Sequence, residues 1–283
     1  MVPSDLPSWL RDSNRPTLVM GILNLTPDSF TDGGQFAARD AALAHAQVML
    51  ADGADWIDVG AESTRPGSQR VPAGEQMARL MPVLTELRRR VPVVLSIDTT
   101  LAPVAQAALD AGVDVVNDIS AGRDDADMLP LLARRGVPVI LMHMLGQPAT
   151  MQLDPRYQNV TREVREFLTR RACAAERAGI SREQILLDPG IGFGKTVAHN
   201  LQLLRELPSL AALGRPVVIG ASRKGFIGTI TGEAADSGRP FGTAATVAWA
   251  AANGAAIVRV HDVAPMAQVV RMVRAIVESN SDS

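Results

Sequence analysis

The chain has 283 residues, of which 47% are hydrophobic and 20% are charged, and its formal net charge is −2. This composition argues against a disordered protein, and the near-neutral charge argues against nucleic-acid binding through bulk charge. The single cysteine excludes a disulfide framework or a cysteine metal cluster and is typical of a reducing compartment. The first residues, MVPSDLPSWLRDSNRP, lack the basic-then-apolar pattern of a signal peptide, so we expect a cytoplasmic protein.

Short apolar runs rich in β-branched residues recur along the chain, and amphipathic stretches with helical periodicity lie between them. The predicted strands are 17–23, 56–59, 93–97, 115–117, 137–142, 185–188, 217–221 and 257–260. The predicted helices include 39–51, 74–90, 102–111, 160–178, 196–207 and 264–277. Eight strands alternating with helices predict a parallel sheet that is buried on both faces. We therefore predict a single α/β domain over residues 16–278, a closed (β/α)₈ TIM barrel, with tails at 1–15 and 279–283; an open doubly wound sheet is the alternative.

The longest uncharged run covers residues 240–258 and is rich in alanine. It contains Thr243, Thr246 and Asn253 and is interrupted by Gly254, so we interpret it as a buried helix followed by a strand. We therefore expect no membrane-spanning segment.

Polar residues gather at the carboxyl ends of the predicted strands. They are Asn24, Asp58, Asp98, Asn117, His143, Asp188, Ser222 to Lys224, Arg259 and His261. In a barrel these ends converge on one face, where such enzymes carry out their chemistry. Turn and capping residues would explain some of them singly, but one composite site explains all eight strand ends.

The glycine-rich segment 190–196, GIGFGKT, resembles two nucleotide-binding motifs without matching either. A Walker A loop requires glycine at Pro189, and the dinucleotide fingerprint requires its third glycine at Lys195. We therefore reject both motifs. The four histidines form no HExxH pair, so we expect no zinc held by protein ligands alone.

Two groups of residues at the strand ends indicate different tasks. Arg259 and His261 are two positions apart in a strand, point the same way and can hold one anion, with Arg223 and Lys224 adding positive charge. The alternative for this pair is a structural salt bridge to Asp262. Three further groups, Asp98, Asn117 and Asp188, can accept hydrogen bonds from the edge of a flat heterocycle.

Eight segments of the chain, in order, resemble the dihydropteroate synthase family. They are MGILNLTPDSFTDGG, IDVGAESTRPG, SIDT, VNDIS, LMHM, DPGIGFGKT, GASRKGFIG and RVHDV. Any one of them is a weak signal, but all eight in this order are specific, and the likeness covers residues 17–277. The resemblance implies a (β/α)₈ barrel and a transferase of folate biosynthesis. This enzyme joins (7,8-dihydropterin-6-yl)methyl diphosphate to 4-aminobenzoate and releases diphosphate and 7,8-dihydropteroate.

The resemblance also implies roles for individual residues. The pterin diphosphate would be bound by Thr64, Asp98, Asn117, Met142, Asp188, Lys224, Arg259 and His261. The 4-aminobenzoate slot would be formed by Phe30, Pro66, Phe193, Lys224 and Gly225. Catalysis would rest on Asp98, Lys224, Arg65 and Asp32, and Asn24 would be the protein ligand of a magnesium ion, which prefers oxygen ligands. The loops TPDSF and STRPG would close over the site and exclude water from a dissociative substitution.

One position departs from the family pattern. Gly225 stands where many members carry a serine whose hydroxyl helps to hold the aminobenzoate carboxylate. The resemblance further implies a homodimer and competition between sulfonamides and 4-aminobenzoate. Two alternative functions are a pterin-binding relative without synthase activity and an NTP-hydrolysing domain built on residues 190–196. The presence of both loops, TPDSFTDGG and STRPG, favours the synthase.

Overall fold

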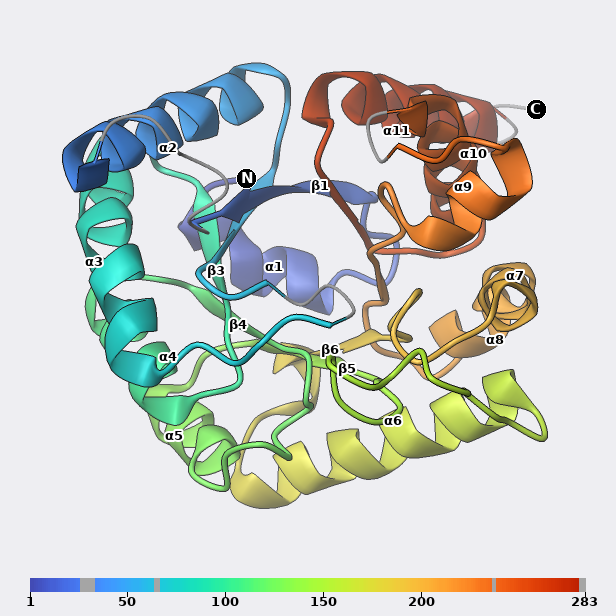
Figure 1. Ribbon diagram of the computed structural model, residues 1–283, viewed down its shortest axis with the longest axis horizontal. Coiled ribbons are helices and arrows are strands. Elements are labelled where there is room, and N and C mark those ends of the chain that lie inside the picture. Colours follow the sequence, from blue (N-terminus) through green and yellow to red (C-terminus); the bar gives the residue numbers. More distant parts are fainter. Residues whose placement is uncertain (26–33, 64–66, 236–237, 280–283) are drawn as a thin grey trace.

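The computed structural model describes residues 1–25, 34–63, 67–235 and 238–279. Its strands form a ring that is surrounded by helices (Figure 1). The strands are β1 (Leu18–Asn24), β2 (Trp56–Gly60), β3 (Val94–Asp98), β4 (Val115–Asp118), β5 (Val139–Met142), β6 (Ile185–Asp188), β7 (Val218–Ile219) and β8 (Ile257–Val260). The longer helices are α2 (Gly34–Ala51), α3 (Ala73–Arg90), α4 (Ala102–Asp110), α5 (Met128–Arg135), α6 (Val160–Ala178), α7 (Val197–Arg205), α10 (Pro240–Ala252) and α11 (Val263–Glu278). Shorter helices are α1 (Leu6–Arg11), α8 (Leu207–Ala211) and α9 (Gly225–Thr231).

All eight strands are parallel and lie in one sheet of order β6-β5-β4-β3-β2-β1-β8-β7. The two ends of this order meet through a bridge between Leu187 and Val217, and the Leu187 amide donates to the Pro216 carbonyl at 2.9 Å. The predicted (β/α)₈ barrel is therefore confirmed, and the open-sheet alternative is wrong.

The predicted elements are confirmed, with changed bounds in several places. The predicted helix 196–207 is interrupted at Glu206, because Pro208 lacks the amide that would continue the α7 hydrogen-bond ladder into α8. The predicted strand 217–221 is reduced to Val218–Ile219. The uncharged run 240–258 is a helix followed by a strand, as predicted.

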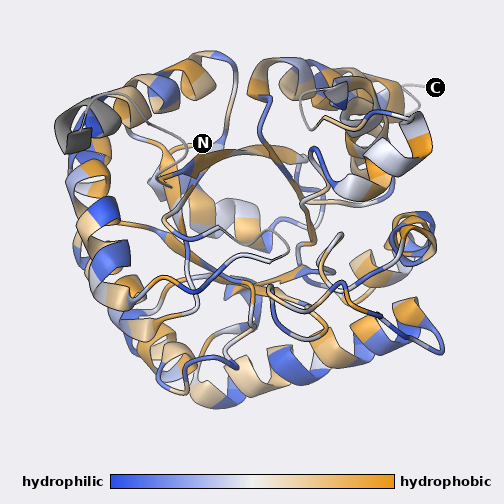
Figure 2. Cartoon of the chain, viewed as in Figure 1, coloured by the Kyte–Doolittle hydropathy of each residue, from blue (hydrophilic) through white to orange (hydrophobic). Residues whose placement is uncertain are grey.

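The barrel interior at its amino-terminal end is filled by one apolar side chain from each strand. These are Met20, Trp56, Val94, Val115, Ile140, Leu186, Val218 and Ile257. A second, larger core lies between the outer faces of the strands and the helices. Figure 2 accordingly shows the strand ring in hydrophobic colours, while the surrounding helices alternate between hydrophobic and hydrophilic residues. Strands buried on both faces explain the continuous apolar runs in the sequence.

Residues 1–15 were predicted to be a tail, and this prediction is wrong. Helix α1 closes the amino-terminal end of the barrel and buries Leu6, Trp9 and Leu10 against the interior cluster. The Trp9 ring packs edge-on against Trp56 with ring centroids 5.7 Å apart. Arg15 fixes the end of the helix by donating to the carbonyls of Trp9 at 3.1 Å and Leu10 at 2.9 Å. A six-residue helix has too little periodicity to be distinguished from a tail in the sequence.

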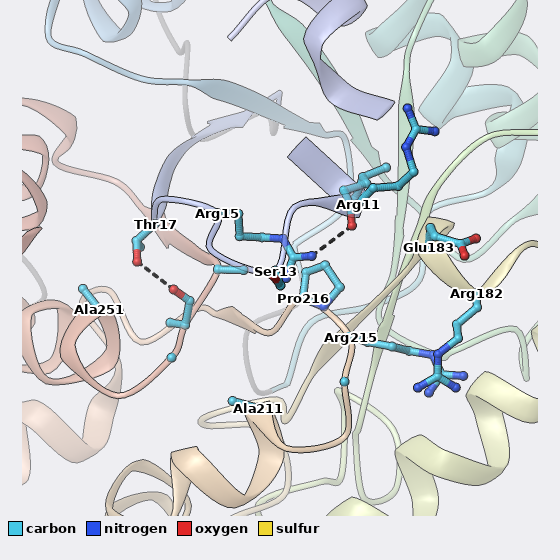
Figure 3. Close-up of a pocket in the computed structure, with 15 residues that line it drawn as sticks. Arg11, Ser13, Arg15, Thr17, Arg182, Glu183, Ala211, Arg215, Pro216 and Ala251 are labelled. Carbon is cyan, nitrogen blue, oxygen red and sulfur yellow. Dashed lines mark hydrogen bonds between the residues drawn. The ribbon is translucent and has the colours of Figure 1, made fainter. Parts of the chain in front are cut away.

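A cavity of about 740 Å³ lies at this same end of the barrel (Figure 3). Four arginines line it, but they do not converge on one point. Arg15 donates to the carbonyls at the end of α1, Arg215 pairs with Glu176 at 2.6 Å, and Figure 3 shows Arg11 extending away from Arg182 and Arg215. Of the predicted site residues that the structure describes, none lines this cavity.

We expect Trp9→Ala to lower the free energy of unfolding by about 3–5 kcal/mol, because it removes a buried aromatic side chain from the base of the barrel. Urea denaturation measures the change. Leu153→Ala is the control, since Leu153 is 78% exposed, and we expect a change of less than about 0.5 kcal/mol. Equal effects of the two substitutions would contradict a supporting role for α1.

Candidate functional site

Strand alternation carries the polar residues of the sequence onto the inner wall of the barrel. The residue two or four positions beyond an interior apolar residue points the same way. For seven of the eight strands this rule gives a predicted or polar residue: Asn24, Asp58, Asp98, Asn117, Met142, Asp188 and Arg259. The register places Asn24, Gly60, Asp98 and Asn117 side by side across four strands, and Met142 beside Asp188. The carboxyl end of the barrel therefore brings together the strand-end residues that the sequence predicts to lie on one face.

Four of these side chains form one hydrogen-bonded group, which we name the polar cluster: Asp58, Asp98, Asn117 and Arg259. The Arg259 Nε donates to Asp58 Oδ2 at 2.6 Å, and its Nη2 donates to Asp98 Oδ2 at 2.9 Å. The Asn117 amide nitrogen donates to the same Asp58 oxygen at 3.1 Å. The alternative for the pair Arg259 and His261 was a salt bridge to Asp262, and for Arg259 it is wrong, because this side chain pairs with Asp58 and Asp98. Asp262 is instead held by Arg223, whose Nε donates to it at 3.0 Å.

Burial shifts the pKa values of the two site carboxyls upward. Burial raises the pKa of Asp98 to about 7, with the Arg259 charge opposing the shift and the Asp58 charge adding to it. Burial also raises the pKa of Asp188 to about 6, against the hydrogen bond from the Gly190 amide and the charge of Lys224. Both carboxyls thus change charge near neutral pH, where a bound donor or cation decides their state.

An apolar wall lies beside these groups. Met142 and Phe193 belong to a small buried cluster with Ile119, Met144 and Met151. The Lys224 ammonium lies over the Phe193 ring, 4.0 Å from its centroid, in a cation–π contact. This arrangement brings three of the predicted substrate contacts, Met142, Phe193 and Lys224, to the same side of the site.

His261 follows β8 and lies next to Arg259. Its Nδ1 is 3.1 Å from the Ser222 hydroxyl, and its backbone amide donates to the same oxygen at 3.2 Å. Burial and the charges of Arg259 and Arg223 lower the pKa of His261 to about 4. At neutral pH the ring is uncharged, so it offers a hydrogen bond to an anion and Arg259 supplies the charge.

The glycine-rich segment packs the loop after β6 closely against the loop after β5. Gly190 has φ +67°, and a Cβ there would lie 1.9 Å from the His143 carbonyl oxygen. Gly194 has φ +62°, and a Cβ there would lie 2.6 Å from the Leu145 carbonyl oxygen. Only glycine permits this approach of the loop after β6 to the loop after β5.

Lys195 is turned into the protein and is 3% exposed. Its ammonium contacts four acceptors: His143 Nδ1 at 3.0 Å, the carbonyls of Gly190 and Phe193 at 2.9 Å each, and the His143 carbonyl at 3.5 Å. Burial lowers the pKa of Lys195 to about 7 and the pKa of His143 to about 2, so the imidazole is a neutral acceptor. These contacts connect the loop after β6 to the end of β5, and the ammonium is not available to a phosphate.

Five predicted site residues lie outside the described residues: Phe30, Asp32, Thr64, Arg65 and Pro66. The sequence places Asp58 and Ser222 among the strand-end polar residues, but we predicted no role for either of them. The signal for Asp58 was its place in WIDVG, two positions after an inward Trp56.

A magnesium ion fits the donors at this end of the barrel under one condition. Among the described residues, no three His, Cys, Asp or Glu side chains are placed to hold a metal together. Asn24 offers one amide oxygen at the end of β1, and Mg²⁺ often combines one or two protein oxygens with water and substrate phosphates. The residues therefore fit a magnesium ion that arrives with a phosphorylated substrate.

We expect Lys195→Met to lower the free energy of unfolding by about 2–4 kcal/mol, because four buried acceptors lose the hydrogen bond that the ammonium donates to them. Urea denaturation measures the change. Lys224→Met is the control, since the chain has only these two lysines and Lys224 is partly exposed; we expect a change below about 1 kcal/mol. Unchanged stability of Lys195→Met would contradict the connection between the two loops.

The chain is similar to known proteins in both sequence and structure. A family model described as "Pterin binding enzyme" matches residues 20–261. The chain is 46% identical over 276 residues to a dihydropteroate synthase of Synechocystis sp., which covers 97% of this chain and 96% of that protein. The structure of Yersinia pestis dihydropteroate synthase with a sulfonamide drug complex has a TM-score of 0.88 at 42% identity, over 94% of this chain and 96% of that chain. The structure of Xanthomonas albilineans dihydropteroate synthase with 7,8-dihydropteroate has a TM-score of 0.83 at 41% identity, over 93% and 94%.

None of the helices in the described part of the chain has the length and apolarity needed to cross a membrane. The family match covers most of the sequence, and both the identity and the shared barrel extend over nearly the full length of the relatives. The chain belongs to the pterin-binding enzymes and, within them, to the dihydropteroate synthases.

Proposed function

We propose that the carboxyl end of the barrel binds (7,8-dihydropterin-6-yl)methyl diphosphate and 4-aminobenzoate and joins them by dissociative substitution. The observation that carries this proposal is the meeting of Asp98, Asn117 and Asp188 from three strands beside the apolar wall of Met142 and Phe193. Oxygen acceptors with an apolar neighbour suit a flat ring that is rich in N–H groups. The product, 7,8-dihydropteroate, places this transferase in folate biosynthesis.

The pterin ring is recognised by the nearly buried acceptors. The Asn117 amide nitrogen is engaged by Asp58, so its oxygen is left to accept from the ligand. The side chains of Asp98 and Asp188 each retain one or more oxygens that accept from N–H groups, and Lys224 is close enough to Asp188 to lower its pKa by charge. Met142 packs at the end of β5 against the ring face.

The diphosphate is held beside the ring by Arg259 and His261, with Asn24 as the protein ligand of Mg²⁺. The two hydrogen bonds of Arg259 to Asp58 and Asp98 leave further N–H groups of its guanidinium for phosphate oxygens. The neutral His261 ring donates one hydrogen bond. When bound, Mg²⁺ would supply positive charge to the departing diphosphate oxygens.

The bond between the methylene carbon and the diphosphate oxygen breaks first, and its electron pair leaves with the oxygen. The resulting cation is conjugated with the pterin ring and is stabilised by the nearby Asp98 carboxylate. The amine of 4-aminobenzoate then forms the carbon–nitrogen bond, and its surplus proton passes to the released diphosphate or to water. Because an arylamine is a weak nucleophile, its position beside the cation matters more than base strength.

The aminobenzoate slot is proposed at Phe193, Lys224 and Gly225. The Lys224 ammonium over the Phe193 ring gives this slot an aromatic wall and a positive charge for the carboxylate. Sulfonamides resemble 4-aminobenzoate in shape and charge, so we expect them to compete for the slot. The contributions of Phe30, Asp32, Thr64, Arg65 and Pro66 remain predictions from the sequence.

A cytoplasmic homodimer is part of the proposal. The one cysteine, Cys173, is unpaired and suits a reducing compartment. Helices α10 and α11 expose large apolar side chains that can form an interface, namely Phe241, Trp249, Met272, Ile276 and Val277.

The direct test is an assay of purified protein with both substrates and Mg²⁺, in which diphosphate and dihydropteroate are measured. Formation of both products at equal amounts supports the proposal. Binding of the pterin diphosphate without product would instead support a pterin-binding relative that lacks synthase activity.

We expect Asp98→Asn to weaken binding of the pterin diphosphate about 10- to 100-fold, because an amide donor replaces a carboxylate acceptor on the ring edge. Equilibrium titration without 4-aminobenzoate measures the Kd. Unchanged affinity would show that the ring is placed wrongly.

We expect kcat/KM for the pterin substrate to fall as the pH drops below about 7. The raised pKa values, about 7 for Asp98 and about 6 for Asp188, mean that both acceptors become protonated in this range. A steady-state profile from about pH 5 to about pH 9 measures the fall, which steepens below pH 6. A flat profile would be incompatible with ionised acceptors at the ring.

We expect Gly225→Ser to leave kcat intact and to leave the KM for 4-aminobenzoate unchanged or lower. A Cβ at Gly225 meets no atom of the described residues within 4 Å, so the side chain has room among them. Gly192→Ser is the control, since a Cβ there would lie 3.0 Å from Lys224 Cδ at a φ of +84°, and we expect a higher KM. A large loss of kcat in Gly225→Ser would contradict this position for the slot.

A further inference from the structure

Asp58 is the innermost member of the polar cluster. Its side chain is fully buried in β2, and it lies beneath the groups proposed to touch the substrate. One of its oxygens, Oδ2, accepts both from Arg259 at 2.6 Å and from Asn117 at 3.1 Å. Asp58 therefore contacts two proposed ligand-binding residues from β4 and β8 at once.

The contact with Asn117 decides which way the amide faces. A carboxylate accepts and cannot donate, so the amide nitrogen must point toward Asp58. The side-chain oxygen of Asn117, Oδ1, then points away from Asp58. Within the described part of the chain, no group donates a hydrogen bond to this oxygen. Asp58 thereby turns Asn117 into an acceptor for a ligand N–H group.

The contact with Arg259 holds the guanidinium at a fixed depth. Asp58 accepts a hydrogen bond from Nε, and Asp98 accepts one from Nη2. The plane of the guanidinium is therefore fixed by carboxylates on two neighbouring strands. Without Asp58, Arg259 would keep only its hydrogen bond to Asp98. It would then bind the Asp98 carboxylate more tightly, and that carboxylate would be a weaker acceptor for the pterin.

This arrangement is costly for the fold. The second oxygen, Oδ1, is buried without a hydrogen-bond partner among the described residues. An apolar side chain at this place would avoid the desolvation of a charge, because a buried ion pair is often no more stabilising than a well-packed apolar group. The fold alone therefore gives little reason for an aspartate here.

We propose that Asp58 is a positioning residue for pterin recognition, which orients the Asn117 amide and the Arg259 guanidinium without touching the substrate. The inference rests on the proposed function, since it assumes that Asn117 and Arg259 bind the pterin diphosphate. It predicts a selective effect on the pterin substrate, because 4-aminobenzoate is placed at Phe193 and Lys224.

Two substitutions grade the effect. Asp58→Ala removes the shared acceptor, and we expect the KM and the Kd for the pterin diphosphate to rise about 30-fold or more. Asp58→Asn keeps an oxygen that can accept both hydrogen bonds but removes the charge, and we expect a rise of about 3- to 10-fold. The KM for 4-aminobenzoate should change less than about threefold in both.

Asp114→Ala is the matched control. Asp114 also accepts from an arginine, Arg88, and from the Leu95 amide at 2.9 Å, but it lies at the opposite end of the barrel. We expect it to lower stability while leaving both KM values within about threefold. Circular dichroism and thermal unfolding confirm that each variant is folded.

A double-mutant cycle tests whether Asp58 acts through Asn117. If it does, adding Asp58→Ala to Asn117→Ala raises the Kd for the pterin diphosphate less than it does in the parent chain. Isothermal titration without 4-aminobenzoate measures the four Kd values.

Two results would overturn the inference: a folded Asp58→Ala variant whose Kd for the pterin diphosphate is within threefold of the parent, or an equal rise in both KM values. A parent chain that binds the pterin diphosphate but forms no product would remove the proposed synthase function and leave the binding test of Asp58 intact.

Discussion

The Arg259 guanidinium lies between two buried carboxylates, and the geometry of the site depends on this ion cluster. Removing two carboxylates and a guanidinium from water costs several kcal/mol per ion, and the cost is recovered only with close hydrogen bonds. The bonds at 2.6 Å to Asp58 and 2.9 Å to Asp98 meet that condition. The raised pKa of Asp98 is the part of the burial cost that remains. A cationic substrate centre beside Asp98 would recover more of it.

The two ends of the barrel interior have opposite chemistry. At the amino-terminal end, one apolar side chain from each strand packs against α1, and the Trp9 and Trp56 rings meet there. Two positions further along several strands, the inward residue is a carboxylate, an amide or a guanidinium. The apolar layer keeps water from the polar cluster on one side, and in such surroundings each charge acts more strongly than it would in water.

The sequence predicted much of this site because parallel strands order their ends. Once eight strands are recognised, closure brings Asp98, Asn117 and Asp188 to one face whatever the loops do. It did not predict where the long side chains point. Arg223, not Arg259, pairs with Asp262, and Lys195 is turned inward onto His143, because the reach of flexible side chains depends on acceptors that are distant in the chain. The sequence also failed to predict α1, because its apolar residues are buried only once the barrel has formed and its amino-terminal end needs a cover.

The sequence by itself determined the repeated strands, the barrel, the family and the type of chemistry at the strand ends, since these follow from short-range periodicity and from motifs of adjacent residues. The tertiary structure decided which groups share a hydrogen bond. Asp58, Asn117 and Arg259 lie far apart in the chain, and a single carboxylate oxygen joins them. That contact depends both on the strand register and on which side chains point into the barrel. Neither is fixed until the sheet has closed.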